Sequence, residues 1–105
     1  MDTATNNFAD EVRITGAAVT VVDEDAIDLG AATVSGTYSV TAGGAITDSG
    51  TQEITGVTTL VAGSGNDITL NTSTNNFAAV VVITSGRNVA ITDEGTIDLG
   101  AATVS

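Results

Sequence analysis

The chain has 105 residues, which is enough for one domain or for a short piece of a repeat array. Its formal net charge is −11, because 13 acidic residues face only two cations, Arg13 and Arg87. This balance argues against partners such as nucleic acid or an anionic membrane surface, which are bound by Lys and Arg. No apolar run is long enough for membrane insertion as a helix, and the first residues do not form a signal peptide.

The apolar composition predicts a thin β-structured core. Hydrophobic residues make up 42% of the chain, but aromatic residues only 3%, so the core must be built of small side chains. The chain is also rich in Thr, Val and Ile, whose branched side chains suit strands. There is no Cys, which excludes a disulfide framework.

Taken in order, the chain shows short apolar pairs at i, i+2 separated by polar or glycine-containing turns, a pattern typical of short strands. The predicted strands centre on Val12 and Ile14, Val19 and Val21, Ile27 and Leu29, Tyr38 and Val40, Ile46, Ile54, Leu60, Ile68 and Leu70, Phe77, Val81 and Ile83, Val89 and Ile91, and Ile97 and Leu99. No useful window has helical spacing, so essentially no helix is expected.

One long segment occurs twice. Residues 3–35 return as residues 72–105, and both copies end on the same nine residues, 27–35 and 97–105. The second copy carries one extra residue where 85–88 faces 16–18, and a length change in such a patch indicates a turn. The chain is therefore predicted to be a single repeat segment, 1–105.

The apolar residues can be arranged in three columns, with about 23 residues from one level to the next. The columns are Val12, Tyr38, Leu60 and Val81; Val19, Ile46, Ile68 and Val89; and Ile27, Ile54, Phe77 and Ile97. This arrangement predicts a parallel β-solenoid of about four coils, in which stacked coils pair their strands and share one core. In a solenoid the rest of each coil provides the long crossover that parallel strands need.

The solenoid prediction specifies which side chains point inward. They are Val12, Ile14, Val19, Val21, Ile27, Leu29, Ile46, Ile54, Leu60, Ile68, Leu70, Phe77, Ile83, Val89, Ile91, Ile97 and Leu99. The competing architecture is an immunoglobulin-type sandwich, which also has a strand every 8–12 residues. The absence of Trp, the shortness of the strands and the internal repeat argue against it.

Three groups of residues are candidates for binding. Residues 63–70 contain Gly, Asp and Ile in the order of a calcium-binding nonapeptide, but the motif does not recur nine residues away, which favours a glycine-rich turn with Asp67 capping backbone amides. Residues 23–25 with Asp28, and residues 93–94 with Asp98, could bind a metal ion or form a solvated acidic edge, and the edge is favoured.

The Asn pairs 6–7 and 75–76 are compatible with a buried polar ladder or with left-handed turn geometry. Without His or Cys, the sequence offers no catalytic acid–base or nucleophilic group of the usual kind. It predicts no catalytic, cofactor-binding or metal-binding residue, and no enzyme activity.

Several phrases of the chain, at residues 40–50, 65–70, 75–77 and 97–100, resemble the long repeats of giant bacterial surface adhesins of the filamentous-haemagglutinin-like and autotransporter-like kind. The resemblance implies an all-β, right-handed parallel β-solenoid that acts as spacer and scaffold, secreted or held on the cell surface. Because the chain starts at Met1 and stops inside a repeat at Ser105, it is interpreted as an excised or engineered fragment.

Two other functions remain open at this point. An ice-binding solenoid would need Thr-x-Thr at the same place in every coil, and only residues 3–5 and 72–74 provide it. A polysaccharide-active β-helix would need clustered carboxylates or Arg, which the spacing does not provide.

The ends of the predicted solenoid lack capping repeats, because both match internal stretches of the chain. Unpaired coils of this kind predict head-to-tail self-association that strengthens with salt or added calcium.

Overall fold

The computed structural model describes residues 12–95 and 97–104, which form strands and turns without any helix. No helix in this part of the chain could cross a membrane. Two sheets are present, and every strand pair in them is parallel. The five-stranded sheet contains β2 (Val19–Asp23), β4 (Tyr38–Ala42), β7 (Thr58–Val61), β10 (Val80–Gly86) and β12 (Asp98–Val104). The seven-stranded sheet contains β1 (Val12–Gly16), β3 (Ile27–Val34), β5 (Ile46–Asp48), β6 (Gln52–Ile54), β8 (Ile68–Leu70), β9 (Asn76–Phe77) and β11 (Val89–Ile91).

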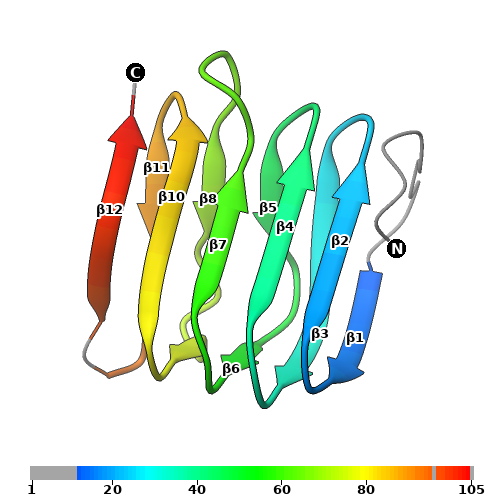
Figure 1. Ribbon diagram of the computed structural model, residues 1–105, viewed down its shortest axis with the longest axis vertical. Coiled ribbons are helices and arrows are strands. Elements are labelled where there is room, and N and C mark those ends of the chain that lie inside the picture. Colours follow the sequence, from blue (N-terminus) through cyan, green and yellow to red (C-terminus); the bar gives the residue numbers. More distant parts are fainter. Residues whose placement is uncertain (1–11, 96, 105) are drawn as a thin grey trace.

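The chain winds between these sheets as a right-handed solenoid. In Figure 1 it rises through a strand of the five-stranded sheet in front, turns over the top and descends through the seven-stranded sheet behind. Each further coil is added on the left, so β4, β7, β10 and β12 follow β2 in order. The right-handed parallel β-solenoid of about four coils is therefore confirmed, and it has the hand that parallel crossovers take almost without exception.

The first coils are shorter than predicted. Val19 pairs with Tyr38 and Tyr38 with Thr58, so the first two steps along this wall fall short of the predicted coil length, whereas the step from Thr58 to Val81 equals it. In the other sheet, the paired residues Ile27 and Ile46 are as far apart in sequence as Val19 and Tyr38. The longer later coils accommodate the loop at residues 62–67 and the one before β9.

The shorter coils overturn part of the predicted column assignment. Ile46, Ile68 and Val89 do share one column, but Val19 pairs with Tyr38 in the opposite sheet. Ile27 aligns with Ile46 rather than Ile54. Val19 and Val89 thus lie on opposite walls of the solenoid, contrary to the prediction, although the parallel pairing of neighbouring coils excludes a sandwich.

The two copies of the repeat consequently occupy opposite walls. The strands β3 and β12 share the sequence Asp-Leu-Gly-Ala-Ala-Thr-Val, yet β3 belongs to the seven-stranded sheet and β12 to the five-stranded one. Between them the chain crosses from wall to wall an odd number of times, so one period of the repeat corresponds to three and a half coils. The predicted division of the repeat into three coils is wrong by half a coil.

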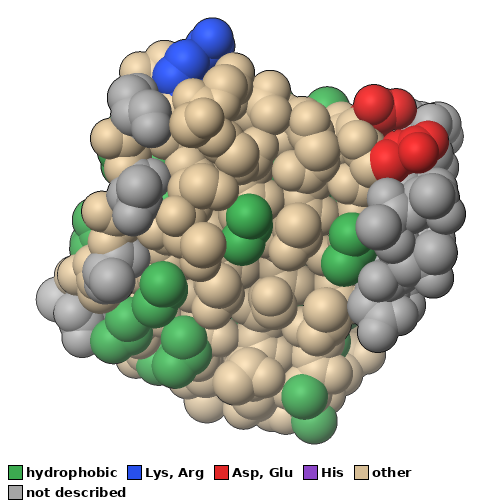
Figure 2. All heavy atoms as spheres, turned by 45° about the horizontal axis from the view of Figure 1, so that its top comes forward, with side chains coloured by type: hydrophobic (Ala, Val, Ile, Leu, Met, Phe, Trp, Pro, Cys, Tyr) green, Lys and Arg blue, Asp and Glu red, His purple; other side chains and the backbone are tan. Residues whose placement is uncertain are grey.

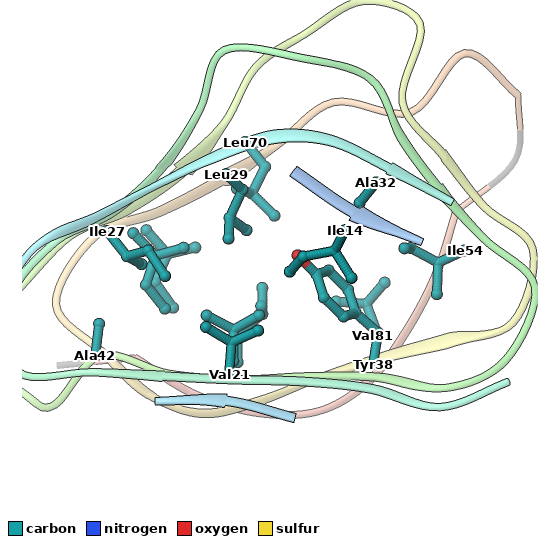
Figure 3. Close-up of a cluster of buried hydrophobic side chains, with 14 of the residues drawn as sticks. Ile14, Val21, Ile27, Leu29, Ala32, Tyr38, Ala42, Ile54, Leu70 and Val81 are labelled. Carbon is teal, nitrogen blue, oxygen red and sulfur yellow. The ribbon is translucent and has the colours of Figure 1, made fainter. Parts of the chain in front are cut away.

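The core is a narrow apolar layer between the two walls (Figure 3). Of the residues predicted to face inward, twelve are buried: Val12, Ile14, Val21, Ile27, Leu29, Ile46, Ile54, Leu60, Ile68, Leu70, Phe77 and Ile83. Val19, Val89 and Ile91 are partly buried against them. Ile97 and Leu99 are 37% and 52% exposed, because no described strand follows β12 to cover them.

The turns lie where the glycine and polar clusters predict them. Residues 17–18 connect β1 to β2 and residues 87–88 connect β10 to β11, so the two turns have the same length. The extra residue of the second copy is Ser85, which lies inside β10 where the register against β7 and β12 shifts, so the prediction that it lies in a turn is wrong. Residues 43–44, 49–50 and 55–56 form the bends around β5 and β6.

Candidate functional site

A buried polar corner joins three successive segments where β6 begins. The Asn75 Oδ1 atom accepts a hydrogen bond of 2.8 Å from the backbone N–H of Gln52, and Asn75 Nδ2 donates to Asp48 Oδ2 at 2.6 Å. Gln52 Nε2 donates to the Gly30 carbonyl at 2.6 Å, one coil in the other direction. This geometry supports the polar-ladder interpretation of residues 75–76 through Asn75. The Asn6–Asn7 pair lies outside the described residues.

The left-handed alternative for residues 75–76 is wrong. Among the residues that the structure describes, the only positive φ belongs to Gly63, at 86°. Asn75 is instead held by side-chain hydrogen bonds and is fully buried. The corner is therefore a structural element that ties adjacent coils together.

The glycine-rich loop at residues 63–67 carries an ion pair. Arg87, from the next coil, donates from Nε to Asp67 Oδ1 at 2.9 Å and from Nη2 to Oδ2 at 3.2 Å, and Asn88 Nδ2 adds a bond to Oδ1 at 3.1 Å. The hydrogen bond from Arg87 is the main cause that lowers the pKa of Asp67 below its ordinary value. The carboxylate that resembled a calcium ligand thus binds a guanidinium group of the neighbouring coil.

The acidic turns are organised by their own backbone. Asp23 Oδ1 accepts from the N–H of Asp25, and Asp93 Oδ1 accepts from the N–H of Gly95, both at 2.8 Å. Asp93 Oδ2 also accepts from the N–H of Phe77 at 2.8 Å. Since Asp23 ends β2 on one wall and Asp93 follows β11 on the other, the structure does not bring the two clusters together.

Asp28 and Asp98 complete the predicted acidic clusters. Asp28 lies in β3 and is half-buried, with Oδ1 buried and without a hydrogen-bond partner. Asp98 begins β12. Over residues 12–95 and 97–104, no three or more Asp or Glu side chains are placed to hold one metal ion, and no pocket is found.

The outer face of the five-stranded sheet is a feature that the sequence interpretation missed. Its outward side chains are uncharged along β2, β4 and β7 and at Val82 of β10; they are Thr20, Val22, Ser39, Thr41, Thr59, Val61 and Val82. In Figure 2 the charged groups in view lie at the edges of the molecule, away from its middle. The signal was the alternation of Thr, Ser and Val with the core residues, which becomes an array only once the register is known.

The predicted Thr-x-Thr positions do not contribute to this face. Residues 72–74 belong to the loop between β8 and β9, and residues 3–5 lie outside the described part of the chain.

The last described strand leaves an apolar row uncovered. In β12 and just before it, Ile97, Leu99 and Val104 are 37%, 52% and 54% exposed. Their sequence equivalents in β3 are Ile27, Leu29 and Val34, which are at most 1% exposed because β5 and β6 pair with that strand.

Comparison with known proteins gives a family without an assigned activity. The family model described as "Repeats of unknown function (DUF5649)" matches residues 16–84, about one period of the internal repeat. No curated protein and no solved structure matched the chain. Because the family model covers more than half of the sequence, the chain belongs to the DUF5649 repeat family.

Proposed function

We propose that this chain is a structural spacer repeat of a large secreted or cell-surface adhesin, without enzymatic activity of its own. The observation that carries the proposal is the continuity of the backbone ladder. Strands β2, β4, β7, β10 and β12 pair one after another on one wall, and β3, β5, β8 and β11 do so on the other. A ladder of this kind can be lengthened coil by coil without changing its cross-section.

Side-chain contacts between coils support a stiff spacer. The buried corner of Gln52 and Asn75 and the ion pair of Asp67 with Arg87 each connect adjacent coils. The apolar core is continuous through the described coils. Bending or pulling apart two coils would break backbone hydrogen bonds, core contacts and these polar contacts together.

The half-coil period also suits a spacer. The sequence shared by β3 and β12 forms a strand on either wall, so one repeat can follow another although each new copy starts on the opposite side. The adhesin context and the cell-surface or extracellular location rest on the resemblance of residues 40–50 and 97–100 to adhesin repeats.

The test is the length of tandem chains that contain two, four and six copies of the repeat unit. Coils about 4.8 Å apart, at three and a half coils per unit, give an increment of about 17 Å per unit. Small-angle X-ray scattering and electron microscopy measure the increment, and the cross-section should stay constant. Units that fold separately as beads would add roughly 28 Å each, the diameter of a globule of about 70 residues, and would refute the continuous spacer.

A further inference from the structure

The outer face of the five-stranded sheet forms a regular two-dimensional array. One column contains Thr20, Ser39, Thr59 and Val82, which pair in register through β2, β4, β7 and β10. The second column contains Val22, Thr41 and Val61. Hydroxyl and methyl groups therefore repeat about every 4.8 Å across the strands and about every 6.6 Å along them.

The hydroxyl groups of this array are left to solvent. Within the described part of the chain, Thr20, Ser39, Thr41 and Thr59 make no side-chain hydrogen bond to protein. On the opposite wall, Thr47 differs, since its Oγ1 donates to the Ile27 carbonyl. Hydroxyl groups in register, each free to bond water, can hold waters in an arrangement that repeats with the strands.

The array is also rigid and nearly flat. In Figure 3, which looks along the solenoid, the wall that carries Val21, Tyr38 and Ala42 is close to straight. Parallel pairing on both sides fixes β4 and β7, and the branched side chains of Thr and Val have few χ1 rotamers. Binding to this face would thus require little ordering of the protein.

We propose that this face binds ice, independently of any spacer role. No strand of the face carries the Thr-x-Thr pair that the sequence analysis required, and the proposal rests instead on the in-register column of Thr20, Ser39 and Thr59. Ice offers donors and acceptors to every hydroxyl group and has a repeating surface that a repeating protein face can match. A charged ligand would find no counter-charge among the outward residues of β2, β4 and β7. A protein partner would bury the hydroxyl groups, at about 1–3 kcal/mol for each one left unpaired. A second copy would in addition bring another charge of −11.

The experiment compares the whole chain with two single variants in the same coil. Thr59→Tyr places a bulky ring in the middle of the array, and Thr69→Tyr places the same ring on β8 of the opposite wall. Both threonines are outward-facing and half-buried, so the variants are matched in chemistry and exposure. Thermal hysteresis and inhibition of ice recrystallisation are measured at micromolar protein, and circular dichroism melts verify the fold. Thr41→Tyr replaces Thr59→Tyr if that variant does not fold.

We expect thermal hysteresis and recrystallisation inhibition from the unmodified chain and from Thr69→Tyr, and their loss in the array variant. A folded, unmodified chain without either activity overturns the proposal, and so does equal loss in both variants. Sedimentation velocity is the third measurement. If the unmodified chain and Thr69→Tyr are dimers and Thr59→Tyr is a monomer, the face joins two copies, and this result would also overturn the ice-binding proposal.

Discussion

Tyr38 is the largest fully buried side chain of the described core, and it carries a polar group. It is 1% exposed, and its hydroxyl group has no hydrogen-bond partner in the structure. A buried hydroxyl without a partner lowers stability. We therefore expect Tyr38→Phe to increase the free energy of unfolding by about 1 kcal/mol. Urea denaturation of both proteins measures the difference. A loss of more than about 1 kcal/mol in the variant would mean that the hydroxyl group has a partner after all.

The burial of the Tyr38 phenol also allows a prediction of how the free energy of unfolding depends on pH in the alkaline range. Burial raises the pKa of the Tyr38 phenol above its ordinary value of 10.0. Below pH 10 the phenol is protonated in both states; above it, the unfolded chain loses the proton more readily than the folded one. Stability should therefore fall as pH rises above 10, and Tyr38→Phe should remove this fall.

The ionisation can be followed directly, since Tyr38 is the only tyrosine and the chain contains no Lys. Ultraviolet absorbance of the phenolate and circular dichroism, recorded over the same alkaline titration, should change together. Ionisation at the ordinary phenol pKa with the fold intact would contradict the burial of the side chain.

Asn75 and Asn76 are adjacent and of one type, but their environments are opposite. Asn75 is buried and satisfies the N–H of Gln52, whereas Asn76 is exposed. Asn75→Ala leaves that buried N–H and the Oδ2 atom of Asp48 without the partner that Asn75 provides, and we expect it to cost about 1–3 kcal/mol. Asn76→Ala should change stability by less than about 0.5 kcal/mol, as surface substitutions usually do. Chemical denaturation measures both, and equal effects would contradict the polar corner.

At the scale of elements, the sequence predicts the strands and turns better than their stacking. Pairs such as Ile68 with Leu70 alternate with solvent-facing residues, and turns follow the glycine clusters at residues 43–44, 49–50 and 55–56. Gly30 and Gly100 are exceptions, because β3 and β12 continue through them. These are local signals. Stacking is decided by coil length, and one period of the repeat can be divided into three longer coils or three and a half shorter ones. The observed pairings, such as Val19 with Tyr38 and Ile27 with Ile46, distinguish the two.

The candidate sites also depend on how the coils stack, which the sequence alone does not specify. The sequence shows Asp67 in a glycine-rich turn, but its partner Arg87 belongs to the next coil and meets it only because the coils stack. The hydroxyl array on β2, β4 and β7 is likewise invisible until the register aligns Thr20 with Ser39 and Thr59. The acidic turns, in contrast, use hydrogen bonds between near neighbours in the chain, which a local pattern can predict.

Close stacking of turns leaves no space for a side chain at some glycine positions. A Cβ atom on Gly56 would lie 2.3 Å from the carbonyl oxygen of Gly36 in the previous coil, whereas a Cβ on Gly65 would meet nothing within 4 Å. Gly56→Ala must therefore push two coils apart, and we expect a loss of about 1–3 kcal/mol, as for overpacking. Gly65→Ala is the control and should be nearly neutral. Thermal melts measure both, and equal melting temperatures would show that the turns yield easily.

At the scale of the whole molecule, the exposed apolar row at β12 favours association and the high negative charge opposes it. The described chain measures 32 × 29 × 20 Å, and the full sequence carries a net charge of −11. Repulsion between copies is screened beyond about 8 Å at physiological ionic strength. The row of Ile97, Leu99 and Val104 is exposed, and its equivalents in β3 are buried by the next coil. Its edge also offers unpaired backbone groups, which favour strand addition.

We therefore predict end-to-end association through β12 that strengthens as salt is added. Leu99→Glu places a charge in the exposed row and should keep the protein monomeric at high salt. Val57→Glu is the matched control, because Val57 is 39% exposed but belongs to the turn before β7, away from that end. Sedimentation velocity over a salt series at constant protein concentration measures association. Since both variants add the same charge, equal loss of association would indicate general repulsion, and a strictly monomeric unmodified chain at high salt would refute the role of the open end.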